Sequence, residues 1–171
     1  MRGLKRIRQV FWYLWPSASE LPAEWAGKGL TPAQRRLFEG MSRPDRAHAI
    51  RVATRLAGRQ APAWVLEAAL LHDCGKPAWY GLFWRCAGVV LDRWLPDEAE
   101  SAGEPDPHAP WAGLHIYRWH DALGFAAAEQ AGTSPRALEL LKHYAQVATP
   151  EAPDPELSHW LTHLSASDDE G

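Results

Sequence analysis

Residues 63–77 read AWVLEAALLHDCGKP, and this stretch decides how the rest of the chain is interpreted. Its first nine residues are apolar on nearly every side, with Glu67 as their only charge. A helix of this kind has no solvent face, so it is expected at the centre of a helical domain. Gly75 and Pro77 are residue types that commonly end helices. The helix is therefore expected over 63–72, ending at the adjacent pair His72 and Asp73.

The sequence on either side of this stretch predicts further helices. Thr31, Pro32 and Gln34 form a capping-box pattern with proline at the first helical position, which starts a helix over 32–41. No stretch alternates apolar and polar residues beside a hairpin turn. The expected fold is all-α, a single domain of about six or seven helices over 31–171 that follows residues 1–30. The other expected helices cover 43–59, 82–95, 115–131, 135–148 and 155–166, and an acidic surface loop is expected over 96–110.

Length and composition describe an ordinary globular protein with an uneven charge. The chain has 171 residues, 46% of them hydrophobic and 23% charged, which excludes disorder as the main state. No apolar run approaches the roughly 18 residues of a membrane span. Residues 1–60 hold 12 Lys and Arg against 4 Asp and Glu, whereas the remainder is acidic. The overall charge gives no nucleic-acid footprint, and the two cysteines are interpreted as reduced thiols in a cytoplasmic protein.

The first 16 residues carry a pattern of their own. Arginines precede a run of aromatic residues, and Leu4, Ile7, Phe11 and Leu14 recur at helical spacing. The apolar run is too short and too aromatic for a signal peptide. A short amphipathic helix is expected, and three roles stay open. The helix packs on the domain, lies at a membrane surface as a peripheral contact, or binds a partner.

Four histidines and a carboxylate are expected to face inward from five different helices. Each lies on an apolar helical seam, beside one, or at the end of the central helix. Burying so many polar groups is costly unless they are satisfied together, as a metal centre would do. Imidazole and carboxylate ligands suit Mn, Fe, Co, Ni or Zn, and carboxylates also admit Mg. The residues of this set are His48, His72, His120, His143 and Asp168.

The remaining histidines are not expected to be ligands. His115 is about 140° around its helix from His120, so the two cannot face one centre. His108 falls in the acidic loop. His159 and His163 lie one turn apart, away from the apolar seam of their helix.

The residues around these histidines resemble a known family, the HD-domain metal-dependent phosphohydrolases. The string LLHDCGK at 70–76 resembles the family's apolar-His-Asp-x-Gly-Lys signature. The string DRAHAIRVA at 45–53 is similar to the motif that provides the first histidine, and HDALG at 120–124 resembles the His-x-x-x-Gly of members holding two metals. His143 and Asp168 stand where that subset has its second histidine and closing aspartate. The resemblance covers residues 40–170, approximately.

The resemblance implies an all-α fold and a set of site residues. It implies two divalent cations per chain, although one or two cations, and Asp168 or Asp169 as the closing ligand, stay open. Asp73 would bridge the pair and help to orient the attacking water, and Lys76 would reach a phosphate oxygen. Arg46 and Arg118 are further candidates for binding the phosphate. The implied metal ligands are His48, His72, Asp73, His120, His143 and Asp168.

The implied activity is hydrolysis of a small-molecule phosphate ester or anhydride, expected to be a nucleotide, by metal-activated hydroxide. No Gly-Tyr-Pro follows His143 and no acidic pair follows Asp73. Both departures argue against the branches that carry those motifs, which act on cyclic dinucleotides and on guanosine tetra- and pentaphosphate. Two other functions stay open: a metal or nucleotide sensor without turnover, and a membrane-associated adaptor that works through residues 1–16.

Overall fold

The computed structural model describes residues 29–91, 109, 111–145 and 154–170. The helix expected within residues 1–16 lies outside them, as does almost all of the loop expected over 96–110. The helices expected over 82–95 and 135–148 are described as far as residues 91 and 145.

The described residues form seven α-helices, which confirms the all-α fold predicted from the sequence. No strand occurs among these residues, where Met41 and Pro77 form an isolated bridge. One helix begins three residues earlier than expected, at Ala112, and one ends three residues later, at Asp169. The helices are α3 (Pro32–Gly40), α4 (Arg43–Gly58), α5 (Ala63–Leu71), α6 (Leu82–Leu91), α7 (Ala112–Gln130), α8 (Pro135–Ala145) and α9 (Pro155–Asp169).

Side-chain caps fix where several helices begin. The capping box predicted for α3 is present: the Gln34 backbone N–H donates to Thr31 Oγ1, and the Thr31 N–H donates to Gln34 Oε1 at 2.8 Å. Asp154 caps α9 by accepting from the Leu157 N–H at 2.8 Å. Ser42 caps α4 through the Asp45 N–H. These bonds satisfy N–H groups that have no partner inside their helix.

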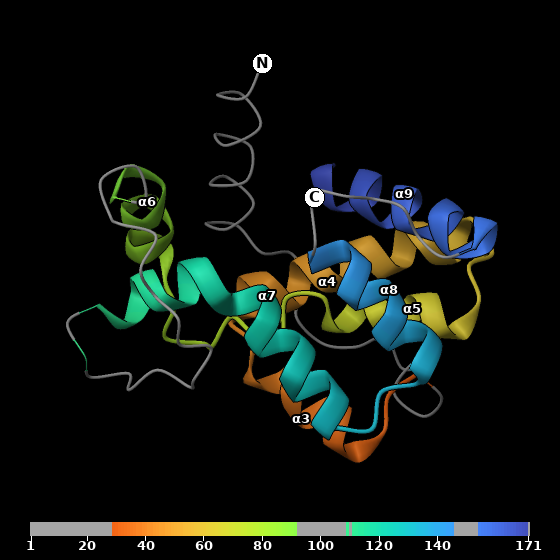
Figure 1. The fold of residues 1–171 in the computed structure, drawn as a ribbon, viewed down its shortest axis with the longest axis horizontal. Helices are drawn as coiled ribbons and strands as arrows, with labels where there is room; N and C mark the ends of the chain where they lie inside the picture. Colours follow the sequence, from red (N-terminus) through yellow and green to blue (C-terminus); the bar gives the residue numbers. More distant parts are fainter. Residues whose placement is uncertain (1–28, 92–108, 110, 146–153, 171) are drawn as a thin grey trace.

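Helix α5 lies at the centre of the larger lobe, as its all-round apolar sequence predicts. It packs against α4, α8 and α3, while α9 packs against α4 and α8 (Figure 1). Val65, Ala68 and Leu70 are at most 1% exposed. Burial of such side chains is the main free-energy term that holds the helices together. The chain therefore leaves α5 at residue 71 from inside the core, which places the next residues in a buried environment.

A close backbone approach joins the turn after α5 to α7. A Cβ atom on Gly75 would lie 1.9 Å from the carbonyl oxygen of His120 and 2.6 Å from the backbone nitrogen of Gly124. A Cβ on Gly124 would lie 3.0 Å from the Gly75 nitrogen. Only glycine permits this contact at position 75. Gly124 likewise lets α7 come close to the turn that follows His72.

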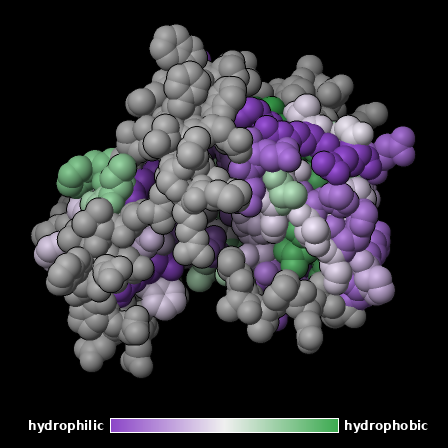
Figure 2. All heavy atoms as spheres, turned by 90° about the horizontal axis from the view of Figure 1, so that it is seen from above, coloured by the Kyte–Doolittle hydropathy of each residue, from purple (hydrophilic) through white to green (hydrophobic). Residues whose placement is uncertain are grey.

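Helix α6 packs on the first half of α7 and forms the smaller lobe, on the left of Figure 1. Figure 2 shows mostly hydrophilic surface on the side of α9 and a hydrophobic area on the side of α6. Phe83, in the first turn of α6, is 73% exposed. Trp79 and Trp111 are exposed as well. None of the described helices combines the length and the apolar content needed to cross a membrane.

Candidate metal centre

The end of α5 brings His72 and Asp73 toward one point. The last helical residue is Leu71, and a turn follows in which the Cys74 N–H donates to the Leu71 carbonyl at 3.0 Å. His72 Nε2 lies 3.8 Å from Asp73 Oδ1, and both residues are buried. Successive side chains on a regular helix point about 100° apart. As predicted from the sequence, the approach occurs where the helix ends.

Three residues from three parts of the chain form a compact group. His48 comes from α4, His72 from the end of α5 and Asp168 from the last turn of α9. His48 Nε2 lies 2.6 Å from Asp168 Oδ1, and His72 Nε2 lies 3.6 Å from the same oxygen. One ligand atom from each residue lies within 4.8 Å of the other two, a spacing that could hold a metal ion. These three residues are called the His48 group below.

One ring nitrogen of His72 is oriented as a ligand atom. Its Nδ1 lies 2.8 Å from the carbonyl oxygen of Ala69, to which it donates. The proton therefore sits on Nδ1 in the neutral ring, and Nε2 carries a lone pair. Nε2 is buried and makes no hydrogen bond. A buried, unpaired nitrogen is costly, and a cation would satisfy it. The residues present thus fit a metal ion.

The electrostatics of the group favour a bound cation. Burial raises the pKa of the Asp168 carboxyl, but the hydrogen bond with His48 and the electrostatic attraction of His48 and His72 outweigh burial and hold the pKa far below its usual range. Burial alone would lower the pKa of His72, whereas the charges of Asp73 and Asp168 raise it to about 9. Both carboxylates are ionised beside two imidazoles. A cation would replace the proton that this negative charge attracts to His72.

Asp73 is paired with Lys76 rather than with the histidines. Lys76 Nζ donates to Asp73 Oδ1 at 2.6 Å. Burial opposes the charged form of both side chains, yet their mutual attraction lowers the pKa of Asp73 and raises that of Lys76. The ammonium therefore stays charged. Lys76, expected to bind phosphate, lies within reach of the site but holds one of the expected metal ligands.

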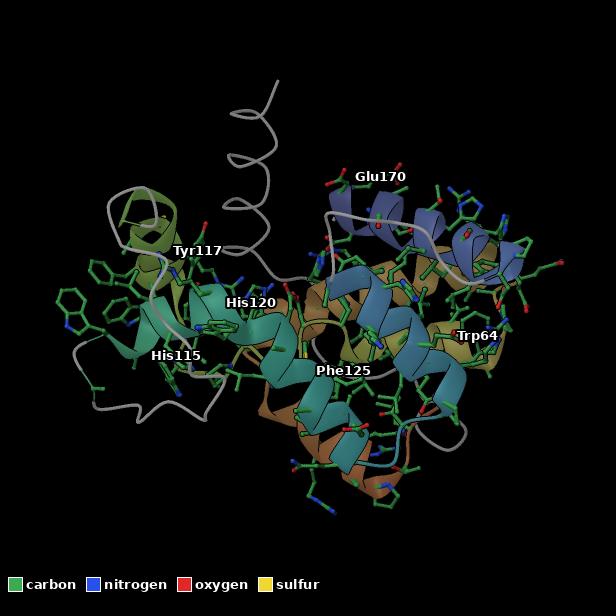
Figure 3. All side chains as sticks on the ribbon, viewed as in Figure 1. Trp64, His115, Tyr117, His120, Phe125 and Glu170 are labelled. Carbon is green, nitrogen blue, oxygen red and sulfur yellow. The ribbon has the colours of Figure 1, made fainter. Side chains whose placement is uncertain are left out.

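His120 lies near this ion pair, outside the His48 group. Its Nδ1 is 3.1 Å from the Ile116 carbonyl oxygen and 3.2 Å from that of Tyr117, and its Nε2 is 3.4 Å from Asp121 Oδ1. Burial, followed by the Lys76 charge, lowers the pKa of His120. In the neutral ring the proton therefore sits on Nδ1, and Nε2 carries the lone pair. Figure 3 shows His120 and His115 on different sides of α7, as their spacing predicted.

Helix α8 carries His143, expected as a metal ligand, and also Tyr144, which contacts the His48 group. His143 is half-buried, its Nδ1 has no hydrogen-bond partner, and it is not among the three grouped residues. The hydroxyl of Tyr144, the next residue, donates to Asp168 Oδ2 at 2.7 Å. Sequence reasoning missed Tyr144, although it continues the buried seam of Ala137, Leu140 and Leu141 at helical spacing.

The two arginines expected to bind phosphate have different surroundings. Arg46 donates to the carbonyl oxygens of Glu39 and Met41, at 3.0 and 2.7 Å, and so holds the end of α3. Arg118 is half-buried on α7. A cation that sequence reasoning missed is Arg85 on α6, whose Nη2 lies 2.8 and 2.7 Å from the two carboxylate oxygens of buried Asp45. These charges act on Lys76.

Two of the histidines not expected to be ligands, His159 and His163, lie on α9, whereas His108 lies outside the described residues. His159 and His163 contact each other on α9, with ring centroids 4.4 Å apart, and His163 Nδ1 is 3.3 Å from Arg59 Nη1. Neither belongs to the His48 group. Asp168 rather than Asp169 contacts His48, which favours Asp168 as the closing carboxylate.

Comparison with protein-family models, with curated proteins and with solved structures found no match for this chain.

Proposed function

We propose that the protein is a metal-dependent phosphohydrolase that cleaves a phosphate ester or anhydride of a nucleotide, similar to the HD-domain enzymes. The observation that carries the proposal is the His48 group with its buried, unpaired His72 Nε2. The group joins residues 48, 72 and 168 from separate helices, the positions at which the chain resembles that family. Two imidazoles, one of them buried, and a carboxylate form a donor set suited to Mn, Fe, Co, Ni or Zn.

His48, His72 and Asp168 would hold the first cation, the two histidines through ring nitrogens and Asp168 through Oδ1. A divalent cation at such a site polarises a phosphoryl oxygen and makes water nucleophilic near neutral pH. Asp73, 3.8 Å from His72 Nε2, is placed to accept a hydrogen bond from the attacking water and to orient it.

Positive side chains beside the group favour an anionic substrate. Lys76 stays charged because its pKa is raised by Asp73 against the effect of burial. The charge of Arg85 also acts on Lys76, but Arg85 is paired with Asp45, whose charge acts in the opposite direction. A phosphate oxygen that approaches Lys76 can share its ammonium with Asp73, since an ammonium has three donors. This charge supports a phosphorylated substrate, and the nucleotide follows from the resemblance.

A second cation would lie between His120, His143 and Asp73. Its binding needs Asp73 to exchange the Lys76 ammonium for the metal, because both use the same carboxylate. The second cation is therefore proposed as the weaker of the two.

The experiment is a panel of nucleotides assayed with Mn, Fe, Co, Ni, Mg and Zn. We expect release of phosphate or of a nucleoside monophosphate that a chelator stops. Asp168→Asn and Asp73→Ala should abolish turnover with the helical circular-dichroism spectrum retained. Asp169→Asn is the matched control, since this exposed neighbour should leave turnover unchanged. Equal activity of Asp168→Asn and the parent protein would show that the site is wrong.

The same panel separates the enzyme from a sensor. Tight metal and nucleotide binding without turnover by the parent protein would favour the sensor. The ion pair between Lys76 and Asp73 favours the sensor as the second candidate function. It occupies a carboxylate that hydrolysis requires.

A further inference from the structure

Among the residues that the structure describes, Tyr144 of α8 forms a hydrogen bond with the His48 group. Its hydroxyl donates to Asp168 Oδ2 at 2.7 Å. Its ring meets that of His72 edge to face, with centroids 5.7 Å apart. The side chain thus contacts two members of the group, one through the hydroxyl and one through the ring.

The two oxygens of Asp168 have separate partners. Oδ1 faces the imidazoles, at 2.6 Å from His48 Nε2 and 3.6 Å from His72 Nε2. Oδ2 accepts from Tyr144. A carboxylate held at one oxygen can still rotate, whereas one held at both has a fixed plane. The hydroxyl of Tyr144 therefore keeps Oδ1 directed at the histidines, as partners of ligating carboxylates generally do.

The register of α8 explains why the tyrosine, rather than the neighbouring histidine, reaches the group. Ala137, Leu140 and Leu141 are the buried residues of the helix. Tyr144 follows them at spacings of seven, four and three residues, so it continues the same face. His143 is rotated about 100° from it. One helix face cannot direct both side chains at Asp168.

Tyr144 is suited to donate a hydrogen bond rather than to bind the metal itself. A tyrosine hydroxyl is an O–H donor near neutral pH, and here it lies 2.7 Å from Asp168 Oδ2. A neutral phenol that donates to a carboxylate stabilises the ionised, ligating form of that carboxylate.

We propose that Tyr144 is a positioning residue that fixes Asp168 and thereby sets the affinity of the cation held by His48, His72 and Asp168. The inference rests on the proposed function, because it requires a cation at that group. Helix α8 thus contributes to the first cation through the phenol of Tyr144. The sequence had indicated His143 as the metal ligand on that helix.

The test is titration of the full chain with Co²⁺ and with Mn²⁺, followed by calorimetry and by the visible absorption of bound Co²⁺. Tyr144→Phe keeps the ring beside His72 and removes only the hydroxyl. We expect its dissociation constant for the first equivalent to rise about 10- to 100-fold, the usual effect of losing such a partner. The control Tyr117→Phe, which removes a hydroxyl from α7, should leave that constant unchanged. Equal affinity of Tyr144→Phe and the parent protein would overturn the proposal.

A parent protein that binds neither ion would instead refute the proposed function, and the role of Tyr144 in metal affinity with it. A double-mutant cycle in chelator then decides whether the pairing itself exists. It combines Tyr144→Phe with Asp168→Asn and measures urea unfolding. Coupling of the two changes should alter the unfolding equilibrium constant by about fivefold or more. Strict additivity would show that Tyr144 does not hold Asp168.

Discussion

Protonation of His72 Nε2 is favoured when the site is empty and is opposed by a bound metal ion. Its Nδ1 is fixed by the Ala69 carbonyl, and its Nε2 points at two carboxylates without accepting a hydrogen bond. Without metal, those carboxylates favour the protonated ring, and the pKa of His72 rises to about 9 although burial opposes the charge. With metal, Nε2 must be deprotonated. The same residue therefore responds to pH in opposite directions in the two states.

In chelator, the free energy of unfolding should fall as the pH rises from 6.5 to 9. A pKa raised from its ordinary 6.5 stabilises the folded state fully below 6.5, and that stability is lost as the pH passes about 9. The loss is on the order of 3 kcal/mol, since one pKa unit corresponds to about 1.36 kcal/mol. Below about pH 4 stability also falls, because Asp73 and Asp168 have lowered pKa values.

Urea unfolding from about pH 2.5 to about pH 9.5 measures this profile. The variant His72→Gln has no imidazole to titrate and should lack the fall above pH 6.5. Added Co²⁺ should make the parent protein more stable toward pH 8, since metal binding releases the proton. A flat profile of the chelated parent between pH 6.5 and 9 would contradict the assignment.

The second residue-scale prediction concerns the number of metal ions. We expect one tight equivalent at the His48 group and a second, weaker equivalent that must displace Lys76 from Asp73. Equilibrium dialysis at increasing Mn²⁺ should resolve the two. His120→Ala should remove the weaker equivalent and spare the tight one. A single equivalent in both proteins at saturating metal would rule out the second cation.

At the scale of helices and turns, Gly75 controls how α7 meets the site. Gly75→Ala should destabilise the protein by about 1–3 kcal/mol or prevent folding, because its Cβ would overlap the His120 carbonyl. Gly124→Ala should cost less, since its Cβ would meet the Gly75 nitrogen at 3.0 Å. Gly58→Ala, with no atom within 4 Å, is the control and should cost nothing. Urea unfolding gives the order, and an equal effect at all three positions would refute it.

The helices were predictable because their signals are local. The capping box of Thr31 and Gln34 and the apolar run of α5 lie within one turn or one helix. The inward faces of His48, His72 and Asp168 followed from the same periodicity. Periodicity did not indicate that Tyr144, rather than His143, faces the His48 group. A shift of one residue along a helix turns the side chain by about 100°.

Pairings between distant residues could not be read from the sequence. The bond between Asp45 and Arg85 joins residues 40 positions apart on two helices. Nothing local to either residue indicates its partner. Asp73 and Lys76 are three residues apart, but their pairing depends on a turn and on burial that only the packed helices provide.

At the scale of the whole molecule, the basic first 16 residues should be separable from the site. Deleting residues 1–16 should leave metal content and turnover of a soluble substrate unchanged, because no proposed ligand lies there. Co-sedimentation with anionic liposomes should fall, given the arginine and aromatic pattern. Neutral liposomes are the control. A large loss of metal on deletion would show that these residues belong to the core instead.

The contact between His48 and Asp168 spans 120 positions of the chain. A metal ion held by both residues is therefore a removable cross-link that closes a long loop and restricts the unfolded chain. Chelation would open this link without breaking a covalent bond. The docking of α9 on α4 would then depend on whether the proposed metal is bound, and resistance to proteolysis would report occupancy of the site.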